Sequence, residues 1–329
     1  MSLVTKFKKH LSTGSLIAPG DTVYVACSGG PDSVALFRLL RQLAPEWKLR
    51  LGLIHVHHSL RGKSADRDAE FVRRLAAKYK VPFVLGKKKV RQMARKEKFS
   101  IEEAAREARL EFFQETAKKR RIRKIALAHT QDDQAETVLM RILKGTGMRG
   151  LSGIRQQLVF GKLKLVRPML QLTKKEILDW LAEEKISFRE DASNRSVKFV
   201  RNRVRNKLLP LLEKEFNPRM KEALARIPEI INQENEMLAD LESAAWSRVY
   251  LKKGKKAIQL DREAFSRFPA PLQFRLLNRA LKQIDSKSGI SFDRWQELSP
   301  QLERRDFRWS LQRDIDLSLS PLQMKLYKK

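Results

Sequence analysis

The stretch Val23-Tyr24-Val25-Ala26-Cys27-Ser28-Gly29-Gly30-Pro31-Asp32-Ser33 decides the fold predicted for this chain. Its apolar first half is typical of a buried strand, and the apolar residues that follow it predict a helix. Between them, Gly29 and Gly30 let the backbone approach an anion closely, and the helix N-terminus supplies positive potential. The hydroxyl groups of Ser28 and Ser33 are further donors. The stretch therefore predicts a loop that binds phosphate groups.

Asp32 does not fit a simple phosphate-binding loop. A carboxylate among phosphate-binding groups repels the ligand unless a divalent cation lies between them, so we predict that Asp32 contacts Mg²⁺. The loop also differs from the Gly-x-x-x-x-Gly-Lys-Ser/Thr loop of the common NTPases, because no lysine follows its second glycine. The alternative is a plain strand-to-helix turn in which Asp32 or Ser33 caps the helix.

Length and composition limit the kind of protein. The 329 residues suffice for two domains with cores of their own, and 42% hydrophobic with 33% charged residues is typical of a soluble globular protein. No apolar run approaches the ~20 residues of a membrane span, and the basic N-terminus lacks a signal core, so we expect a cytoplasmic protein without a membrane partner. Cys27 is the only cysteine, which excludes intramolecular disulfides, cysteine-ligated zinc and dithiol chemistry.

The net charge indicates a polyanionic partner. Lysine and arginine number 69 against 38 aspartate and glutamate residues, which gives +31 and a pI of about 10.5. The charge-rich surface of a thermophile is the alternative, but it predicts that glutamate rises together with lysine, and here acids lag far behind. Binding by phosphate neutralisation is independent of base sequence, so the charge favours nucleic acid without saying which one.

A pair of carboxylates follows the strand predicted over residues 124–129. Asp133 and Glu136 lie three residues apart in the first turn of the next predicted helix, so both can point toward the carboxyl edge of the sheet. Ligands of doubly wound sheets bind beyond that edge, where we expect the backbone near Ile54, at the end of the second predicted strand, to meet an adenine. The alternative is that both acids only complement the helix dipole.

Three histidines within four residues, His55, His57 and His58, end the second predicted strand. A metal site is one interpretation of this run. However, His55 and His57 share a strand face that His58 opposes, and no nearby carboxylate completes a ligand set. The pattern therefore favours a role other than metal binding.

Three groups of basic residues stand out: Lys87 with Lys88 and Lys89, which are candidates for contact with nucleic acid, Arg106 with Arg109, and Arg201 with Arg203 and Arg205. The first opens a dense basic segment, whose alternative interpretation is a solvated helix face. The second lies on one side of the helix predicted over residues 101–119. The third repeats every second residue, which is too regular for a helix stripe, so we expect that segment to be partly extended.

The Ser-Gly-Gly-x-Asp-Ser loop resembles the pyrophosphate loop of the N-type ATP pyrophosphatase superfamily. Within it, the chain resembles the lysidine synthetases in residues 128–137 (Ala-His-Thr-Gln-Asp-Asp-Gln-Ala-Glu-Thr), in the Gly-Thr-Gly-x-x-Gly-Leu run at 145–151 and in the Arg-Asn-Arg-x-Arg run at 201–205. The run from His55 through His58 to Arg61 is also similar to theirs. The resemblance is strong over residues 23–210 and weak afterwards. It implies an α/β fold with a doubly wound, mainly parallel sheet.

The resemblance implies that ATP adenylates the C2 oxygen of the first anticodon cytidine of tRNA(Ile) with a CAU anticodon, and that L-lysine then displaces AMP. The implied cofactors are ATP and Mg²⁺. The residues it assigns to ATP are Ser28, Gly29, Gly30, Pro31, Asp32, Ser33, Ile54 and His55. Because lysine arrives as an ammonium ion, we further expect lysine binding or catalysis at Asp133, Glu136, Arg109 and Arg205. The basic runs predict tRNA contact at Arg201, Arg203, Lys87, Lys88 and Lys89. Whether the chain forms a homodimer is left open.

Other functions fit the residues less well. A tRNA thiolase resembles the same loop, but its chemistry uses cysteine pairs or an iron-sulfur cluster, which one cysteine cannot supply. An amidating synthetase requires a glutaminase motif that is absent and leaves the +31 charge unexplained. A non-enzymatic RNA-binding module has no need for Asp32, Asp133 and Glu136 together. Another type of tRNA-modifying enzyme, one for 2-thiolation, stays as the alternative.

The sequence predicts two domains, an adenylating domain over residues 1–214 and a smaller, mostly helical tRNA-binding domain over residues 215–329. The second begins with one long helical pattern over residues 218–250, bent near Pro228. Residues 252–256 read as a basic turn and residues 257–260 as a short strand. Alternation over residues 307–319 predicts a terminal strand pair.

Overall fold

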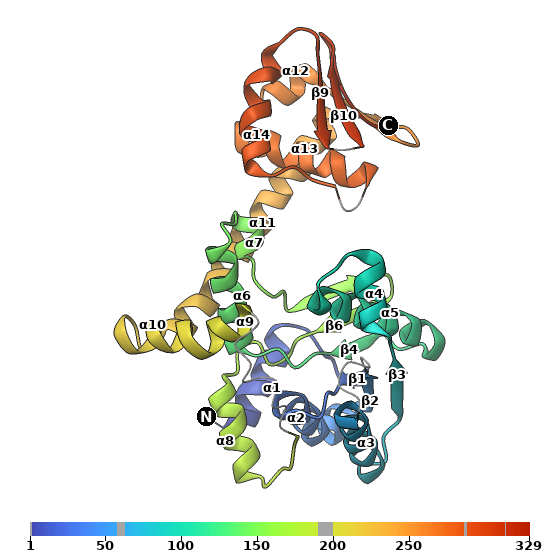
Figure 1. Cartoon of the computed structure of the whole chain (residues 1–329), viewed down its shortest axis with the longest axis vertical. Helices are drawn as coiled ribbons and strands as arrows, with labels where there is room; N and C mark the ends of the chain where they lie inside the picture. Colours follow the sequence, from blue (N-terminus) through green and yellow to red (C-terminus); the bar gives the residue numbers. More distant parts are fainter. Residues whose placement is uncertain (1, 58–62, 190–199, 286–287, 313) are drawn as a thin grey trace. The chain divides into compact units, whose positions relative to one another are not determined.

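The computed structural model describes residues 2–57, 63–189, 200–285, 288–312 and 314–329 (Figure 1). The chain forms two compact units, residues 1–231 and 232–329, which are described separately. The division falls inside helix α11 (Met220–Val249), later in the chain than the boundary predicted at 214/215. The boundary at 214/215 separates an adenylating domain from a tRNA-binding domain, and this functional division stays a prediction.

A six-stranded sheet forms the centre of the first unit, in the order β3-β2-β1-β4-β6-β5 (Figure 1). Its strands are β1 (Thr22–Ala26), β2 (Arg50–His57), β3 (Phe83–Lys87), β4 (Lys124–Ala126), β5 (Gln157–Phe160) and β6 (Leu163–Val166). All neighbours are parallel except the β5–β6 hairpin. The chain runs outward from β1 to β3 and returns to place β4 on the other side of β1. This order confirms the doubly wound, mainly parallel sheet, with its switch point between β1 and β4.

The helices of this unit connect and cover the strands (Figure 1). They are α1 (Leu3–Thr13), α2 (Pro31–Trp47), α3 (Lys63–Lys78), α4 (Val90–Glu97), α5 (Ile101–Arg120), α6 (Gln131–Leu143), α7 (Met148–Leu151), α8 (Lys174–Glu183), α9 (Val200–Arg203), the π-helix η2 (Val204–Leu208) and α10 (Leu209–Glu215). Over the described residues, every helix is too short or too polar to cross a membrane.

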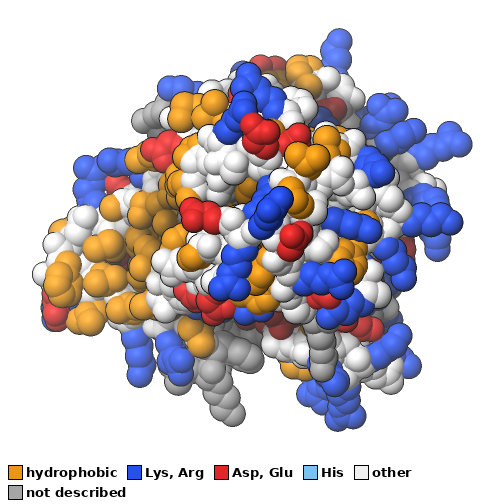
Figure 2. All heavy atoms as spheres, turned by 90° about the horizontal axis from the view of Figure 1, so that it is seen from above, with side chains coloured by type: hydrophobic (Ala, Val, Ile, Leu, Met, Phe, Trp, Pro, Cys, Tyr) orange, Lys and Arg blue, Asp and Glu red, His pale blue; other side chains and the backbone are white. Residues whose placement is uncertain are grey.

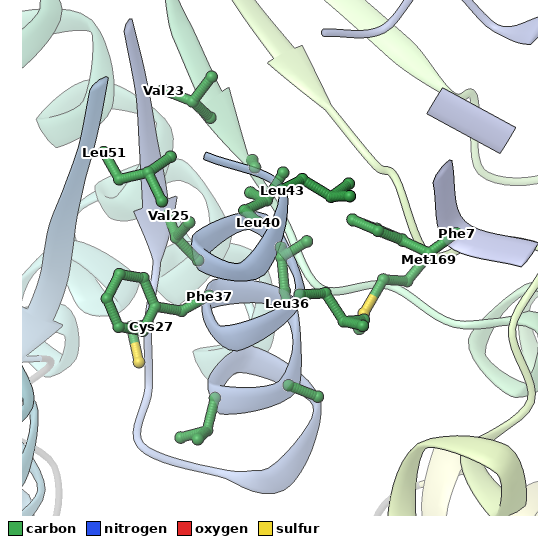
Figure 3. Packing of buried hydrophobic residues seen from close by; sticks show 14 of the residues in the cluster. Phe7, Val23, Val25, Cys27, Leu36, Phe37, Leu40, Leu43, Leu51 and Met169 are labelled. Carbon is green, nitrogen blue, oxygen red and sulfur yellow. The ribbon is translucent and has the colours of Figure 1, made fainter. Parts of the chain in front are cut away.

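Apolar side chains cover both faces of the sheet, because alternate residues of a strand point to opposite faces. Val23 and Val25 of β1 pack with α2, as Figure 3 shows. Tyr24, between them, belongs to a second cluster on the other face, together with Phe113 of α5. Full burial of each such side chain contributes about 1.5–3 kcal/mol. The loop after β1 is therefore held between two rigidly packed elements.

The second unit contains a five-stranded antiparallel sheet in the order β7-β8-β11-β10-β9. Its strands are β7 (Tyr250–Lys253), β8 (Ala257–Asp261), β9 (Phe307–Gln312), β10 (Ile315–Leu319) and β11 (Gln323–Lys328). Its helices after α11 are α12 (Arg262–Ser266), α13 (Ala270–Ile284), α14 (Phe292–Leu298) and the 3₁₀ helix η3 (Ser299–Glu303). One apolar cluster joins the sheet to these helices.

The predicted terminal strands β9 and β10 and the short strand β8 are present, but β7 and β11 were not predicted. β7 is exposed along its whole length and is rich in lysine, so it carries no apolar signal and read as part of a basic turn. In β11, exposed Gln323 and Lys325 alternate with buried Met324 and Leu326. This alternation is a strand signal that could have predicted β11.

Candidate functional site

The loop after β1 is shaped by its own hydroxyl groups. Ser33 is 6% exposed, and its Oγ accepts from Ser28 N at 3.1 Å and donates to Gly30 O at 3.0 Å. Gly29 has φ +93°, a backbone conformation that side chains with a Cβ rarely adopt. Pro31 is the first residue of α2, where the missing N–H costs nothing. The sequence predicts Ser33 as a ligand donor, but in the structure its hydroxyl group holds the loop in shape.

Asp32 has a buried oxygen without a partner. Oδ1 accepts no hydrogen bond in the described chain, and Oδ2 lies 3.6 Å from Lys174 Nζ. Burial raises the pKa of Asp32, and the nearby carboxylate of Asp133 adds to this rise while Lys174 opposes it. A buried, unpaired carboxylate oxygen is unfavourable unless a cation satisfies it. The arrangement fits Mg²⁺, which binds one or two carboxylates together with water and substrate phosphates. No group of three or more His, Cys, Asp or Glu side chains that could hold a metal ion is present among the described residues.

Asp133 and Glu136 form a cluster with two arginines. Arg201 Nε lies 2.8 Å from Glu136 Oε2, and its Nη2 lies 2.9 Å from Asp133 Oδ1. Arg205 donates to Glu136 Oε2 at 2.9 Å and to Asp133 Oδ1 at 3.3 Å. Glu136 is 1% exposed, so its charge is balanced almost entirely by these guanidinium groups. Burial by itself would raise the pKa of Asp133, but Arg201, the Thr130 backbone N–H and Arg205 together hold it below its ordinary value.

The expectation that residues 201–205 are partly extended is wrong. α9 and η2 are helical, and residues four apart on a helix share a face, so Arg201 and Arg205 reach the same carboxylates. Arg203 lies on the other side of the helix and is exposed. Tertiary contact overrides the pattern here, because two buried carboxylates 65 to 72 residues away bind these guanidinium groups.

Residues 2–212 match the family model described as a PP-loop domain. The synthase of Solibacter usitatus, named tRNA(Ile)-lysidine synthase, is 36% identical over 326 residues, which cover 94% of this chain and 71% of that protein. The chain belongs to the PP-loop tRNA(Ile)-lysidine synthase family.

Other members of the family are longer. The synthases of Geobacter sulfurreducens and Clostridium acetobutylicum are 37% and 34% identical to 89% and 82% of this chain. The matched part spans 61% and 58% of their lengths, about three fifths of each protein. Among solved structures, the U34-tRNA thiolase NcsA of Methanococcus maripaludis, with its [4Fe-4S] cluster, is 18% identical with a TM-score of 0.58, over 70% of this chain and 78% of that one. This likeness concerns the fold alone.

Two of the residues expected to contact ATP, Ile54 and His55, are buried at the end of β2. Ile54 is 1% exposed, and its carbonyl accepts from Cys27 N at 2.9 Å. His55 is 5% exposed, and its Nδ1 lies 2.7 Å from Cys27 O. Both therefore support the base of the loop, and their contact with adenine stays a prediction. His57 lies 3.3 Å from Asp66, and His58 lies outside the described residues.

The residues assigned to tRNA contact differ in their partners. Lys87 and Lys89 are exposed, whereas Lys88 pairs with Glu115 at 3.2 Å. Arg109 is exposed on α5 and lies close enough to His129 to affect its pKa. Lys87 and Lys89 are therefore better candidates for contact with a phosphate group than Lys88, whose charge is paired with Glu115.

A buried arginine that the sequence pattern did not single out holds His129. Arg167, 6% exposed, donates from Nε to His129 Nδ1 at 3.1 Å and from Nη1 to the Arg155 carbonyl at 2.7 Å. A guanidinium group can only donate, so His129 Nδ1 must carry its lone pair and Nε2 the proton. Burial lowers the pKa of His129 to about 4, and the positive charge of Arg167 contributes to this shift. The negative charge of Asp133 opposes it. His129 is thus a neutral hydrogen-bond donor beside the carboxylate cluster.

This protonation state gives a testable pH dependence. A histidine with a folded-state pKa of about 4 and an unfolded value of 6.5 binds more protons when unfolded. Its stabilising effect is complete above pH 6.5 and is lost as the pH falls toward 4. Between pH 7.5 and pH 5, we expect the melting temperature of the native chain to fall about 2–4 °C further than that of His129→Asn. Thermal unfolding followed by circular dichroism measures both, and parallel declines would contradict the assignment.

Proposed function

We propose that this chain joins L-lysine to C2 of the first anticodon cytidine of a tRNA(Ile) with a CAU anticodon. The cytidine O2 attacks the α-phosphorus of ATP, and pyrophosphate leaves. The side-chain amine of lysine then attacks C2 and loses a proton, and AMP leaves with the O2 atom. The observation that carries this proposal is the gathering of the phosphate loop, the unpartnered Asp32 oxygen and the Asp133–Glu136 pair at one edge of the sheet. The name of the relatives supports the choice of substrate.

In this proposal Asp32 is the residue that would hold Mg²⁺ beside the phosphates of ATP. The metal ion supplies positive charge that balances the leaving pyrophosphate. The backbone N–H groups of Gly29 and Gly30 and the Ser28 hydroxyl group bind the phosphate oxygens. Lys174, 3.6 Å from Asp32, is a further cation at this point that the sequence pattern did not single out.

The carboxylates of Asp133 and Glu136 are proposed to bind the ammonium group of lysine. Selecting an ammonium ion over neutral side chains requires anions with little access to water, and Glu136 meets this condition. Nearby carboxylates also raise the pKa of the amine, so its attack must be coupled to loss of a proton. Because Arg201 and Arg205 occupy the same oxygens, lysine binding requires at least one guanidinium group to move. Released Arg205, with Arg109, would then bind phosphate or tRNA.

The second domain, residues 215–329 as predicted, is proposed to bind tRNA. Five paired residues, one from each strand, form a row across its sheet in the order β7-β8-β11-β10-β9. They are Lys252, Gln259, Lys325, Ser318 and Arg308. Neighbouring buried residues of these strands point to the opposite, core face. The row therefore places cations and small polar groups on the outer face, which suits a phosphate backbone. Lysine and arginine side chains are also abundant on the face seen in Figure 2.

Ion pairing predicts which lysines contribute to tRNA affinity. Removing Lys87 and Lys89 together, as Lys87→Gln with Lys89→Gln, should lower the slope of log K against log salt by up to ~0.7–0.9 per lost phosphate contact. Lys88→Gln is the control, since Lys88 is already neutralised by Glu115 and should leave the slope nearly unchanged. Filter binding of tRNA at several salt concentrations measures the slopes. Equal slopes in all variants would place the binding surface elsewhere.

The proposed function is tested by nucleoside analysis of tRNA(Ile) after incubation of the chain with ATP, Mg²⁺ and labelled L-lysine. We expect the label in lysidine at the first anticodon position and stoichiometric release of AMP and pyrophosphate. A tRNA whose first anticodon base is uridine is the control. Absence of label with a native tRNA that binds would refute the proposal. The reaction belongs in the cytoplasm, where ATP and tRNA meet.

The 2-thiolation alternative is not favoured. It needs cysteine pairs or an iron-sulfur cluster. Cys27, the only cysteine, is 2% exposed, and burial raises the pKa of its thiol. A buried thiol that resists ionisation is a poor nucleophile or metal ligand.

A further inference from the structure

A groove in the first unit is not used by the reaction proposed above. It is lined by Leu143, Val200, Arg203, Val204, Lys207, Leu208 and Leu211 and has a volume of about 320 Å³. This volume lies within the range of ligand sites, about 300–1,000 Å³. Its lining comes from the end of α6 and from α9, η2 and α10. In Figure 2 a hydrophobic area lies at the left, the side on which α10 lies in Figure 1.

The apolar side chains of the groove are unusually open to water. Leu143 is 59% exposed, Val200 46% and Leu211 45%. Val204 belongs to a buried apolar cluster with residues of α6, and Leu208 packs against that cluster. The floor of the groove is therefore held in place by the core of the first unit. Covering such side chains with an apolar ligand is favourable by about 25 cal/mol per Å² of apolar surface.

Within the described residues, the charged side chains of the groove have no acidic partner. Arg203 and Lys207 are exposed and form no ion pair within the described chain, unlike Arg201 and Arg205 on the same segment. Residues two apart on a helix lie on nearly opposite sides, so the segment presents neutralised arginines to the carboxylate cluster and free cations to the groove. A ligand for the groove therefore combines an apolar surface with a negative charge.

We propose that the groove binds one unpaired nucleotide of the RNA substrate, next to the nucleotide that is modified. Its base lies on Leu143, Leu208 and Leu211, and its phosphate lies between Arg203 and Lys207. The groove is separated from the Asp133–Glu136 cluster by one helix, about 10–12 Å across, a distance that neighbouring nucleotides of a splayed loop can span. This inference rests on the proposed function and adds a binding site for a second base of the anticodon loop.

The test uses the full chain and a 17-nucleotide anticodon hairpin of the RNA with a CAU anticodon, carrying 2-aminopurine at one loop position at a time. We expect 2-aminopurine fluorescence to change on binding at one loop position beside the modified cytidine. The double variant Leu143→Ser with Leu211→Ser should raise the hairpin Kd about tenfold, which corresponds to about 1.4 kcal/mol. It should also abolish that fluorescence change. Both side chains are exposed, so the fold should survive, and circular dichroism checks this.

Matched controls separate the groove from general effects. Val159→Ser removes an apolar side chain that is 57% exposed on β5, and it should leave the Kd unchanged. Lys207→Gln should weaken binding more than Lys162→Gln, which removes an exposed lysine from the β5–β6 turn. If the native chain binds and modifies the RNA but the leucine variant binds equally well, the groove inference alone fails. If the native chain neither binds nor modifies it, the proposed function itself fails. If sedimentation shows that the leucine variant only loses a dimer, the groove is a contact between chains and the inference is overturned.

Discussion

Asp32→Asn should reduce pyrophosphate release by about 100- to 1,000-fold while tRNA affinity stays within about twofold of the native value. Oδ1 of Asp32 is buried and has no partner among the described residues, and an amide in its place cannot offer a charged oxygen to Mg²⁺. Loss of a metal contact removes several kcal/mol of charge stabilisation in the transition state, and 1.36 kcal/mol corresponds to a factor of ten in rate. Burial also raises the pKa of Asp32 in the absence of metal, so the amide of Asp32→Asn mimics the neutral form that the site tolerates.

The measurement is pyrophosphate release with tRNA(Ile), ATP and lysine, together with calorimetry of ATP binding with and without Mg²⁺. Native chain should bind ATP more tightly when Mg²⁺ is present, and Asp32→Asn should lose this difference. Asp179→Asn is the matched control, because Asp179 is an exposed carboxylate paired with Lys175 on α8. If Asp32→Asn keeps both adenylation and the dependence of ATP binding on Mg²⁺, the assignment of Asp32 as a Mg²⁺ ligand is wrong.

Glu136→Gln should separate the two half-reactions. If Glu136 binds the lysine amine, the variant should still form adenylated tRNA and release pyrophosphate, but its KM for lysine should rise by about 10- to 100-fold. This range matches the loss of one charged hydrogen bond, about 1.5–3 kcal/mol. Glutamine has nearly the same shape as glutamate and can still accept from Arg201 or Arg205, so the fold should be retained.

The experiment traps adenylated tRNA without lysine and then adds labelled lysine at increasing concentration. Glu70→Gln serves as control, because it removes a surface carboxylate that pairs with Arg74 on α3. Glu136→Gln that binds tRNA normally but no longer releases pyrophosphate would move Glu136 to the nucleotide site. Arg201→Gln is a second test of the cluster of Asp133, Glu136, Arg201 and Arg205. If a guanidinium group competes with lysine, this variant should keep or lower the KM for lysine.

Local sequence patterns were sufficient for the first strand, loop and helix of the first unit, but not for residues 201–205. The apolar run Val23–Cys27 followed by two glycines predicts β1, its loop and α2, because strand and helix periods and glycine conformations are properties of a few neighbouring residues. The same holds for the helix predicted over residues 101–119, which is α5, and for the alternation that predicts β9 and β10. Family motifs then located Asp32, Asp133 and Glu136, all three of which the structure brings to one edge of the sheet.

The partners of these residues were not predictable from the sequence. That Glu136 meets Arg201 and Arg205 depends on the path by which α9 returns to α6, 65 and 69 residues later in the chain. The bond from Arg167 to His129 and the missing partner of Asp32 Oδ1 likewise depend on which strands and helices become neighbours. The sequence by itself therefore determined β1, its loop, α2 and the excess of positive charge. Tertiary structure alone decided which charges are neutralised and which stay free, because burial and ion pairing arise only when distant segments pack together.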